Sequence, residues 1–176
     1  MQGRVITKKF FNRQTCVVAE NLIGKYLVRR RGRKIIAAMI TEVEAYDGVK
    51  DRASHAHKGR TERNKVMFGP AGFWYVYFVY GMHWMLNVVT GDRGYPAAVL
   101  IRGVQGVSGP GRVTKFFHIN GSFSEKPSAK ASGLWIEDRG AAVEKSAIKK
   151  ITRIGVAYAG PVWSKKKYRF LYDNKS

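Results

Sequence analysis

The sequence is poor in cysteine and in acidic residues. Cys16 is the only cysteine, which excludes an intramolecular disulfide and a zinc site built from a cysteine cluster. The chain has 12 acidic residues against 32 lysines and arginines, so its formal net charge is +20. A field of this sign opposes self-association and attracts polyanions, so we expect a monomer. Nucleic acid is the first candidate partner, and an anionic membrane surface or an acidic protein is the alternative.

Signals for export and for membrane insertion are also missing. Residues 1–11 lack the apolar core and cleavage site of a secretion signal, so we do not expect a secreted protein. Phe68–Gly91 has no Asp, Glu, Lys or Arg and is long enough to be considered as a membrane span. Its glycines and its aromatic and β-branched residues instead favour two buried strands that break near Gly81. We expect no membrane partner, and a location in the cytoplasm or nucleoid of a prokaryote or the nucleus of a eukaryote.

The hydrophobic pattern predicts one α+β domain over residues 1–176, with a mainly antiparallel sheet. Helices are expected from an N-cap at Thr15 to Ile23, shortly after Thr61, and at Gly109–Gly111, where proline suits the first turn. The predicted strands are Lys25–Arg30, Arg33–Ile40, Trp74–Tyr80, Met82–Thr90, Ala97–Arg102, Arg153–Tyr158 and Tyr168–Tyr172. Residues 41–46 continue or end the second of these strands, and residues 120–133 form a polar loop.

The positive charge is concentrated in two segments. Six basic residues and no acid lie between Glu20 and Glu42, and eight basic residues and no acid lie between Glu144 and Asp173. If the fold places these segments on one face, they form a surface that follows a phosphate backbone. The alternative is two solvated segments that keep the protein soluble.

A cluster of acids stands out against this positive background. Four of the twelve acids lie within ten residues: Glu42, Glu44, Asp47 and Asp51. In an extended strand the first two point to the same side. One interpretation is a metal site with His55 and His57 as further ligands, as in a metal-dependent nuclease. A second is a single general base among acids that cap helices or pair with arginine, and a third is ordinary solvated ion pairs.

Aromatic residues accompany the acids. Three side chains of the strand at residues 74–80 share one face: Tyr75, Tyr77 and Val79. Such a strand usually belongs to the core. Tyr80, however, lies beside Gly81 at an expected hairpin tip, where there is little core to fill. A protruding aromatic there could fill the gap left by an extruded base, and Tyr46 would supply a stacking face near the acids.

Short motifs along most of the chain resemble those of a known enzyme family. They are, in order, Thr41–Tyr46, Asp51–Ala56, Arg63–Gly69, Tyr75–His83, Asn87, Ala98–Arg102, Gly109–Arg112, Leu134–Ile136 and Arg153–Val156. In this order they resemble the 3-methyladenine (alkylpurine) DNA glycosylases of the mammalian type. The resemblance implies a single compact domain with a curved antiparallel sheet and surrounding helices. Where the family shows a small-residue end to a helix, this chain has Phe116-Phe117-His118, so the resemblance does not predict that helix end.

The resemblance implies a monofunctional hydrolase of base excision repair. Its partner would be double-stranded DNA that contains damaged purines such as 3-methyladenine, 7-methylguanine or hypoxanthine. Glu44 would activate the water that cleaves the N-glycosidic bond, and Arg102 would help to hold Glu44 and that water. A main-chain carbonyl near Ile154 would also touch the water. No metal, cofactor or lyase activity is implied, and the product is an abasic site.

The resemblance also implies a pocket for a base that has been flipped out of the duplex. Three side chains would form its walls: Tyr46, His55 and Tyr77. The main-chain amide of His55 would donate to the base edge, and Asn87 would exclude the amino group of normal guanine. Tyr80 would enter the minor groove with Met82 beside it. Electron-rich walls suit an alkylated, cationic purine, and extrusion costs least for a damaged base.

Two other functions stay open from the residues alone. A metal-dependent nuclease would use Glu42, Glu44, Asp51 and His55, would lose activity in chelator and would break undamaged DNA. A basic binding module whose aromatic side chains stack on bases would bind without forming a product. Binding by such a module would also not respond to Glu44→Gln.

Overall fold

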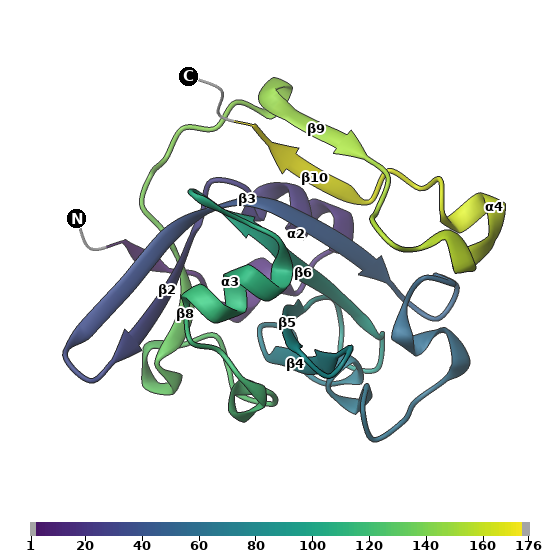
Figure 1. The fold of residues 1–176 in the computed structure, drawn as a ribbon, viewed down its shortest axis with the longest axis horizontal. Helices are drawn as coiled ribbons and strands as arrows, with labels where there is room; N and C mark the ends of the chain where they lie inside the picture. Colours follow the sequence, from purple (N-terminus) through teal and green to yellow (C-terminus); the bar gives the residue numbers. More distant parts are fainter. Residues whose placement is uncertain (1–2, 174–176) are drawn as a thin grey trace.

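The computed structural model describes residues 3–173, and its strands form a ten-stranded antiparallel sheet. The strands are β1 (Arg4–Val5), β2 (Tyr26–Arg31), β3 (Lys34–Asp47), β4 (Trp74–Val79), β5 (His83–Val89), β6 (Ala97–Val104), β7 (Val107–Ser108), β8 (Leu134–Asp138), β9 (Ile148–Ile151) and β10 (Arg169–Tyr172). Their order is β1-β8-β2-β3-β6-β5-β4, with β10 on β3, β9 on β10 and β7 on β6. The path through the described residues does not close, and Figure 1 shows it as a strongly twisted sheet with β3 along its length. The predicted α+β class with a curved, mainly antiparallel sheet is confirmed.

Four short α-helices pack around this sheet within the described residues: α1 (Lys8–Phe11), α2 (Thr15–Leu22), α3 (Pro110–Phe116) and α4 (Gly160–Trp163). The connections contain single turns of 3₁₀ helix: η1 (His55–Lys58), η2 (Lys65–Phe68), η3 (Gly121–Phe123), η4 (Lys130–Ser132), η5 (Lys145–Ala147) and η6 (Ala157–Ala159). Helix α2 packs on β3 and β6, and α3 packs on β5 and β6. The loop predicted at residues 120–133 is therefore largely irregular, with one turn of 3₁₀ helix near each end.

The acid cluster lies on a strand because β3 is long and changes its partner. Its first half pairs with β2 in a hairpin whose turn contains Gly32 at φ +58°, a conformation that glycine adopts without steric cost. Its second half pairs with β6 and with β10 on the other side. The register shifts on either side of Glu42, which indicates a bulge at the handover. Residues 41–46 were expected to continue or end the second predicted strand, and the structure shows that they continue it to Asp47.

Two predicted helix boundaries are refined by the structure. The cap of α2 is Gln14, whose side chain accepts a hydrogen bond from the Val17 amide, and not Thr15. Thr15 instead donates its hydroxyl to Asp47 Oδ1 at 2.9 Å. Helix α3 begins at Pro110 as predicted and ends at Phe116. The next residue, Phe117, is fully buried in the core and anchors the helix end.

The strand predicted at Arg153–Tyr158 is wrong. This segment is a loop that leads into η6, and the strand nearest to it in sequence is β9. Gly155 has φ +71°, which interrupts an extended path, and the Arg153 side chain before it is bonded to a buried carboxylate rather than facing a neighbouring strand. Strand β8 was not among the predicted strands, whereas the strand at Tyr168–Tyr172 is confirmed as β10. The short helix expected after Thr61 is the 3₁₀ turn η2.

Alternation along the strands gives the sheet two different faces. Side chains on one face belong to the main hydrophobic core, and in the four strands around the acids these are Val43, Ala45, Trp74, Val76, Leu86, Val88, Val99 and Ile101. The neighbouring residues of the same strands point to the other face, where a cavity opens. Among the described residues, no helix is long and apolar enough to cross a membrane.

Candidate active site

A cavity lies on the face of the sheet opposite the main hydrophobic core. Its volume of about 330 Å³ is within the size range of small-ligand sites. Strands β3 to β6 supply one part of its lining: Tyr46, Tyr75, Tyr77, Val79, Met85, Asn87, Ala98, Leu100 and Arg102. Loops, turns and the start of α3 supply the rest: Ala53, Ser54, His55, Met67, Tyr80, Pro110, Ile154, Gly155, Val156 and Tyr158. Most of the predicted site residues therefore meet at one place, although Tyr46 and Ile154 are 108 positions apart in the sequence.

Glu44 lies behind the cavity wall and is completely buried. Its Oε2 accepts a hydrogen bond from the Tyr46 hydroxyl at 2.8 Å, and its Oε1 accepts one from the Ile154 amide at 2.8 Å. The Nε of Arg102 lies 3.6 Å from the same Oε1. These three neighbours of Glu44 all line the cavity, so the carboxylate is held directly beneath its surface.

Arg102 contacts two carboxylates, and its shorter contact is not the one that was predicted. Its Nε donates to Glu42 Oε1 at 3.1 Å. The same Glu42 oxygen also accepts from Arg169 Nη1 at 3.1 Å. Glu42 thus places Arg102 between two acids of one strand, as expected if both point to the same side of β3. The expected contact between a main-chain carbonyl near Ile154 and the water stays a prediction, and the structure adds a bond from the Ile154 amide to Glu44.

Tyr46 connects Glu44 to the cavity. Burial and the adjacent Glu44 hold the pKa of its phenol well above the usual range, so the hydroxyl stays protonated and can donate to the carboxylate. The guanidinium carbon of Arg153 lies 4.9 Å from the centre of the Tyr46 ring. The tyrosine is therefore held at both its hydroxyl and its ring.

His55 lies beside two tyrosines at the edge of the cavity. Its Nδ1 is 3.1 Å from the Tyr75 hydroxyl, and its ring centre is 4.6 Å from that of Tyr77. Packing against these rings desolvates the imidazole and, with the positive charge of Arg63, lowers the pKa of His55, although its outer edge stays exposed. Burial raises the pKa of Tyr75 to about 12. The aromatic wall is therefore uncharged at neutral pH.

Two asparagines are held rigidly near this wall. The Asn87 amide donates to the Tyr75 carbonyl at 3.1 Å, which orients its side chain along the cavity lining. Asn64 was not predicted as a site residue, yet it is buried and donates to the His55 and Gly59 carbonyls at 3.0 and 2.9 Å. Asn64 thereby fixes the turn that carries His55.

Exposed side chains surround the cavity mouth. Tyr80 lines it with 89% of its surface exposed, and its φ of +53° is uncommon for any residue other than glycine. Met82 is 67% exposed but does not line the cavity. Tyr158, which the sequence analysis did not select, lines the mouth and donates its hydroxyl to the Ala53 carbonyl at 2.8 Å.

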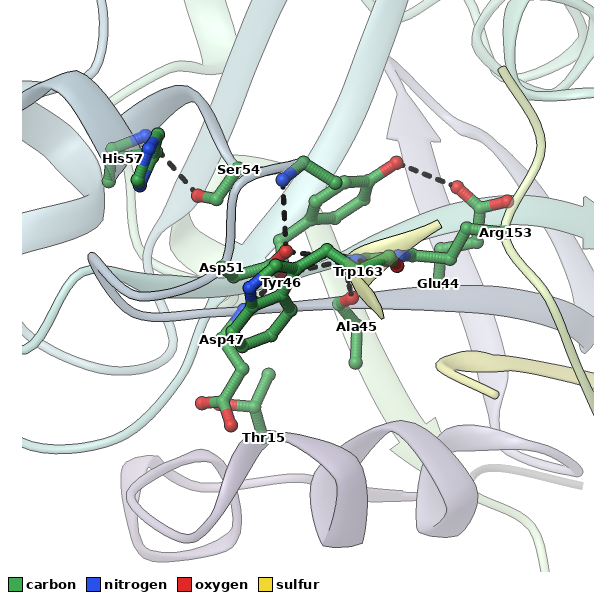
Figure 2. Close-up of polar contacts among 12 residues, drawn as sticks. Thr15, Glu44, Ala45, Tyr46, Asp47, Asp51, Ser54, His57, Arg153 and Trp163 are labelled. Atoms are coloured by element: carbon green, nitrogen blue, oxygen red, sulfur yellow. Dashed lines mark hydrogen bonds and ion pairs between the residues drawn. The ribbon is translucent and has the colours of Figure 1, made fainter. Parts of the chain in front are cut away.

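The buried pair of Asp51 and Arg153 was also missed. Both side chains are fully buried, and two parallel contacts of 2.6 and 2.9 Å join the guanidinium to the carboxylate (Figure 2). Asp51 also accepts from the Asp47 and Ala53 amides. The signal was present, because both residues belong to the ordered motifs, but only the fold shows that the two motifs meet.

The acids proposed as nuclease ligands do not converge on a metal site. Asp51 is bonded to Arg153, Glu42 contacts two arginines, and the Nδ1 of His55 faces a tyrosine. Among residues 3–173, no group of three or more His, Cys, Asp and Glu side chains is arranged to hold a metal ion. Arginine side chains thus bind the carboxylates that such a nuclease would need as metal ligands, and the residues present do not fit the nuclease.

Comparisons with known proteins show the family to which this chain belongs. The family described as methylpurine-DNA glycosylase matches residues 9–108 and 105–176. A Legionella pneumophila (strain Corby) protein named "Putative 3-methyladenine DNA glycosylase" is 39% identical over 179 residues, covering 97% of this chain and 96% of that protein. Proteins of the same name from Rickettsia felis and Methanocella arvoryzae are 42% and 41% identical, over 86% and 89% of this chain and 86% of each relative. The chain therefore belongs to the methylpurine-DNA glycosylase family, which acts in the base excision repair of DNA.

Proposed function

We propose that this protein is a monofunctional DNA glycosylase that flips a damaged purine out of duplex DNA. In this proposal a water activated by Glu44 hydrolyses the N-glycosidic bond and leaves an abasic site. The substrates are purines such as 3-methyladenine, 7-methylguanine or hypoxanthine. The protein acts as a monomer on double-stranded DNA, without a metal or cofactor and without lyase activity.

The observation that carries the proposal is the set of donors around Glu44. A carboxylate offers about four acceptor positions. Tyr46 and the Ile154 amide take one position on each oxygen, and Arg102 lies near a third. One position is left for a water that enters from the cavity. In this proposal the carboxylate takes a proton from that water as a general base.

The cavity walls suit a flipped, cationic base. Tyr46 and Tyr77 line the cavity and keep their phenols protonated, because burial raises the pKa of both. His55 carries no charge that would repel a cation, since its pKa is lowered. An N-alkylated purine is positively charged and is attracted to electron-rich rings. Asn87, held by the Tyr75 carbonyl, is in our proposal the group that excludes the amino group of guanine.

The cavity mouth suits insertion into DNA. Tyr80 projects from the tip of the β4–β5 hairpin and is almost fully exposed. We assign it the role of a wedge that fills the gap left by the flipped base, with Met82 beside it. The net charge of +20 supplies the attraction to phosphates, so binding should weaken steeply as salt rises.

The test is base release from a duplex that contains one alkylated purine or hypoxanthine, measured over time in excess chelator. The matched pair of variants is Glu44→Gln and Glu137→Gln. Glu137 is also a buried strand glutamate (2% exposed), held by Trp135 and Arg139, but it does not line the cavity. We expect Glu44→Gln to lower the rate by at least about 10²- to 10⁴-fold and Glu137→Gln to retain it.

The products separate the possible functions. Free base and an intact abasic strand from the wild type, lost only in Glu44→Gln, support the proposal. Equal activity of Glu44→Gln and wild type would reject Glu44 as the general base. Strand breaks that require added magnesium would favour the nuclease, and binding without release of any tested base would favour the binding module.

A further inference from the structure

The guanidinium of Arg153 is the most heavily bonded side-chain group near the cavity. Besides its two contacts with Asp51, it donates to the Ala45 carbonyl at 2.9 Å and to the Trp163 carbonyl at 3.3 Å. These partners lie in β3, in the loop after β3 and in α4, and Figure 2 draws them together with Arg153. Arg153 therefore ties together three segments that meet behind the cavity wall.

Both hydrogen-bond donors to Glu44 lie next to Arg153, one through a ring contact and one through the chain. The first is Tyr46, whose ring lies under the guanidinium and which follows Ala45, the residue whose carbonyl Arg153 binds. The second is the amide of Ile154, the residue next to Arg153 in the chain. Tyr46 bonds to Oε2 of Glu44 and Ile154 bonds to Oε1, so each carboxylate oxygen has one donor that Arg153 holds in place.

We propose that Arg153 is a positioning residue that sets the orientation of the Glu44 carboxylate through these two donors. This inference rests on the proposed function, since it gives Glu44 the role of general base. Arg153 does not line the cavity and would not touch the substrate. It acts by keeping one lone pair of the carboxylate directed at the water.

Stability alone is a weak reason for this arrangement. Removing two charges from water is costly, and well-packed apolar residues often replace a buried ion pair without loss of stability. Moreover, the Nε of Arg153 is buried and has no hydrogen-bond partner among the described residues. Arg29 and Arg169 share this feature, so what distinguishes Arg153 is that its other bonds hold the groups that contact Glu44.

The molecule contains a second arginine–carboxylate pair that serves as a control, in which Arg139 is 27% exposed whereas Arg153 is fully buried. Arg139 also bonds to a buried acid, Glu137, at 2.7 Å and lies over a tyrosine, with 4.5 Å between its guanidinium carbon and the Tyr26 ring centre. This second arrangement joins β8 to β2 and does not line the cavity. The same substitution at the two arginines therefore separates positioning of Glu44 from general loss of an ion pair.

The experiment compares Arg153→Lys with Arg139→Lys. Lysine keeps the charge but cannot make two parallel bonds to a carboxylate. We expect Arg153→Lys to lower the single-turnover rate of base release by about 10- to 100-fold, the cost of a small misplacement of a reacting group. Affinity for lesion-containing DNA should change by less than about 3-fold, because the substituted side chain is buried away from the DNA. Arg139→Lys should leave both quantities unchanged.

Two further measurements exclude a merely structural effect. The acidic limb of the rate–pH profile of Arg153→Lys should move to higher pH, because a carboxylate with fewer well-placed donors holds its negative charge less well. The effects of Arg153→Lys and Tyr46→Phe on the rate should also be less than additive, since both disturb the same donor. If Arg153→Lys does not fold, Asp51→Asn, which keeps the shape of the pair, replaces it in both measurements.

The outcomes are distinguishable from those of the proposed function. If Glu44→Gln abolishes base release but the rate and pH profile of Arg153→Lys match the wild type, only the positioning role is rejected. Equal losses of rate in Arg153→Lys and Arg139→Lys would also reject it. If Glu44→Gln retains activity, the proposed function fails first.

Discussion

The two faces of the strands around the cavity differ in chemistry, although they share one backbone. On the core face, residues such as Val43 and Ile101 pack into a continuous apolar cluster. On the cavity face, their neighbours Glu44 and Arg102 are polar. Glu44 accepts a hydrogen bond from the Ile154 amide, and Arg102 donates one to Glu42. The first face gains stability from removing apolar surface from water, and the second must compensate for burying charge by hydrogen bonds and ion pairs.

This difference shows how the protein separates folding from chemistry. Because the side-chain period of a strand is two, one residue step moves from the core to the site. Of the three non-glycine residues with a positive φ in the described part of the chain, Tyr80 is the one that lines the cavity. The core face can therefore support a site whose own polar groups contribute little net stability.

The largest contrast is expected between Ile101→Ala on the core face and Glu44→Gln on the cavity face. Ile101 is fully buried in the core and adjoins Arg102 in the chain. Ile101→Ala should lower the free energy of unfolding by about 2–5 kcal/mol through lost burial and a cavity, while folded molecules keep their rate of base release. Denaturant unfolding and single-turnover kinetics at a temperature where the variant is folded measure the two quantities. A rate loss as large as that of Glu44→Gln would show that the faces are not independent.

A smaller effect is expected on selectivity at Asn87. If its side chain excludes the amino group of guanine, Asn87→Ala should raise the release of normal guanine relative to that of hypoxanthine. The expected change in this ratio is about 10-fold or more, the scale of discrimination by one steric contact. Release of both bases from otherwise identical duplexes gives the ratio. An unchanged ratio would assign the discrimination to another part of the lining.

The smallest expected effect concerns pH and His55. Its pKa in the folded protein lies below the ordinary value of 6.5, because burial and Arg63 disfavour the charged form. Between the two values the unfolded chain binds more protons, so this contribution to stability is present above the unfolded pKa and is lost as pH falls toward the folded pKa. His55→Asn should therefore lose less thermal stability than the wild type between about pH 7.5 and about pH 5.5. Parallel losses in the two proteins would show that His55 does not contribute.

Local signals were sufficient for most of the sheet. The β2–β3 hairpin, the β4–β5–β6 strands and β10 follow from alternation and from turn glycines, and the structure has them close to the predicted bounds. Alternation also places Tyr75 and Tyr77 on the same side, where both line the cavity. The same rule would have found Met85 and Leu100, which lie two positions before Asn87 and Arg102 and line the cavity with them.

Local signals failed where a distant partner overrides the local pattern. Arg-Ile-Gly-Val-Ala-Tyr at residues 153–158 alternates like a strand, but Arg153 turns inward to Asp51, 102 positions away. Gly155 then takes a positive φ that ends any extended path. Tyr158 was overlooked for the same reason, since its place at the cavity mouth depends on this loop.

The amino-acid sequence by itself determined the charge, the strand pattern and which residues can share a face, because these depend on composition and on a side-chain period of two. It also determined the family, through motifs in a fixed order. Only the tertiary structure decided that Glu44 is bonded by Tyr46 and the Ile154 amide, that Arg102 bonds first to Glu42, and that Arg153 lies behind them. The physical reason is that, apart from the Tyr46–Glu44 bond within one strand, these contacts join residues far apart in the chain, whose meeting depends on how the whole sheet twists and packs.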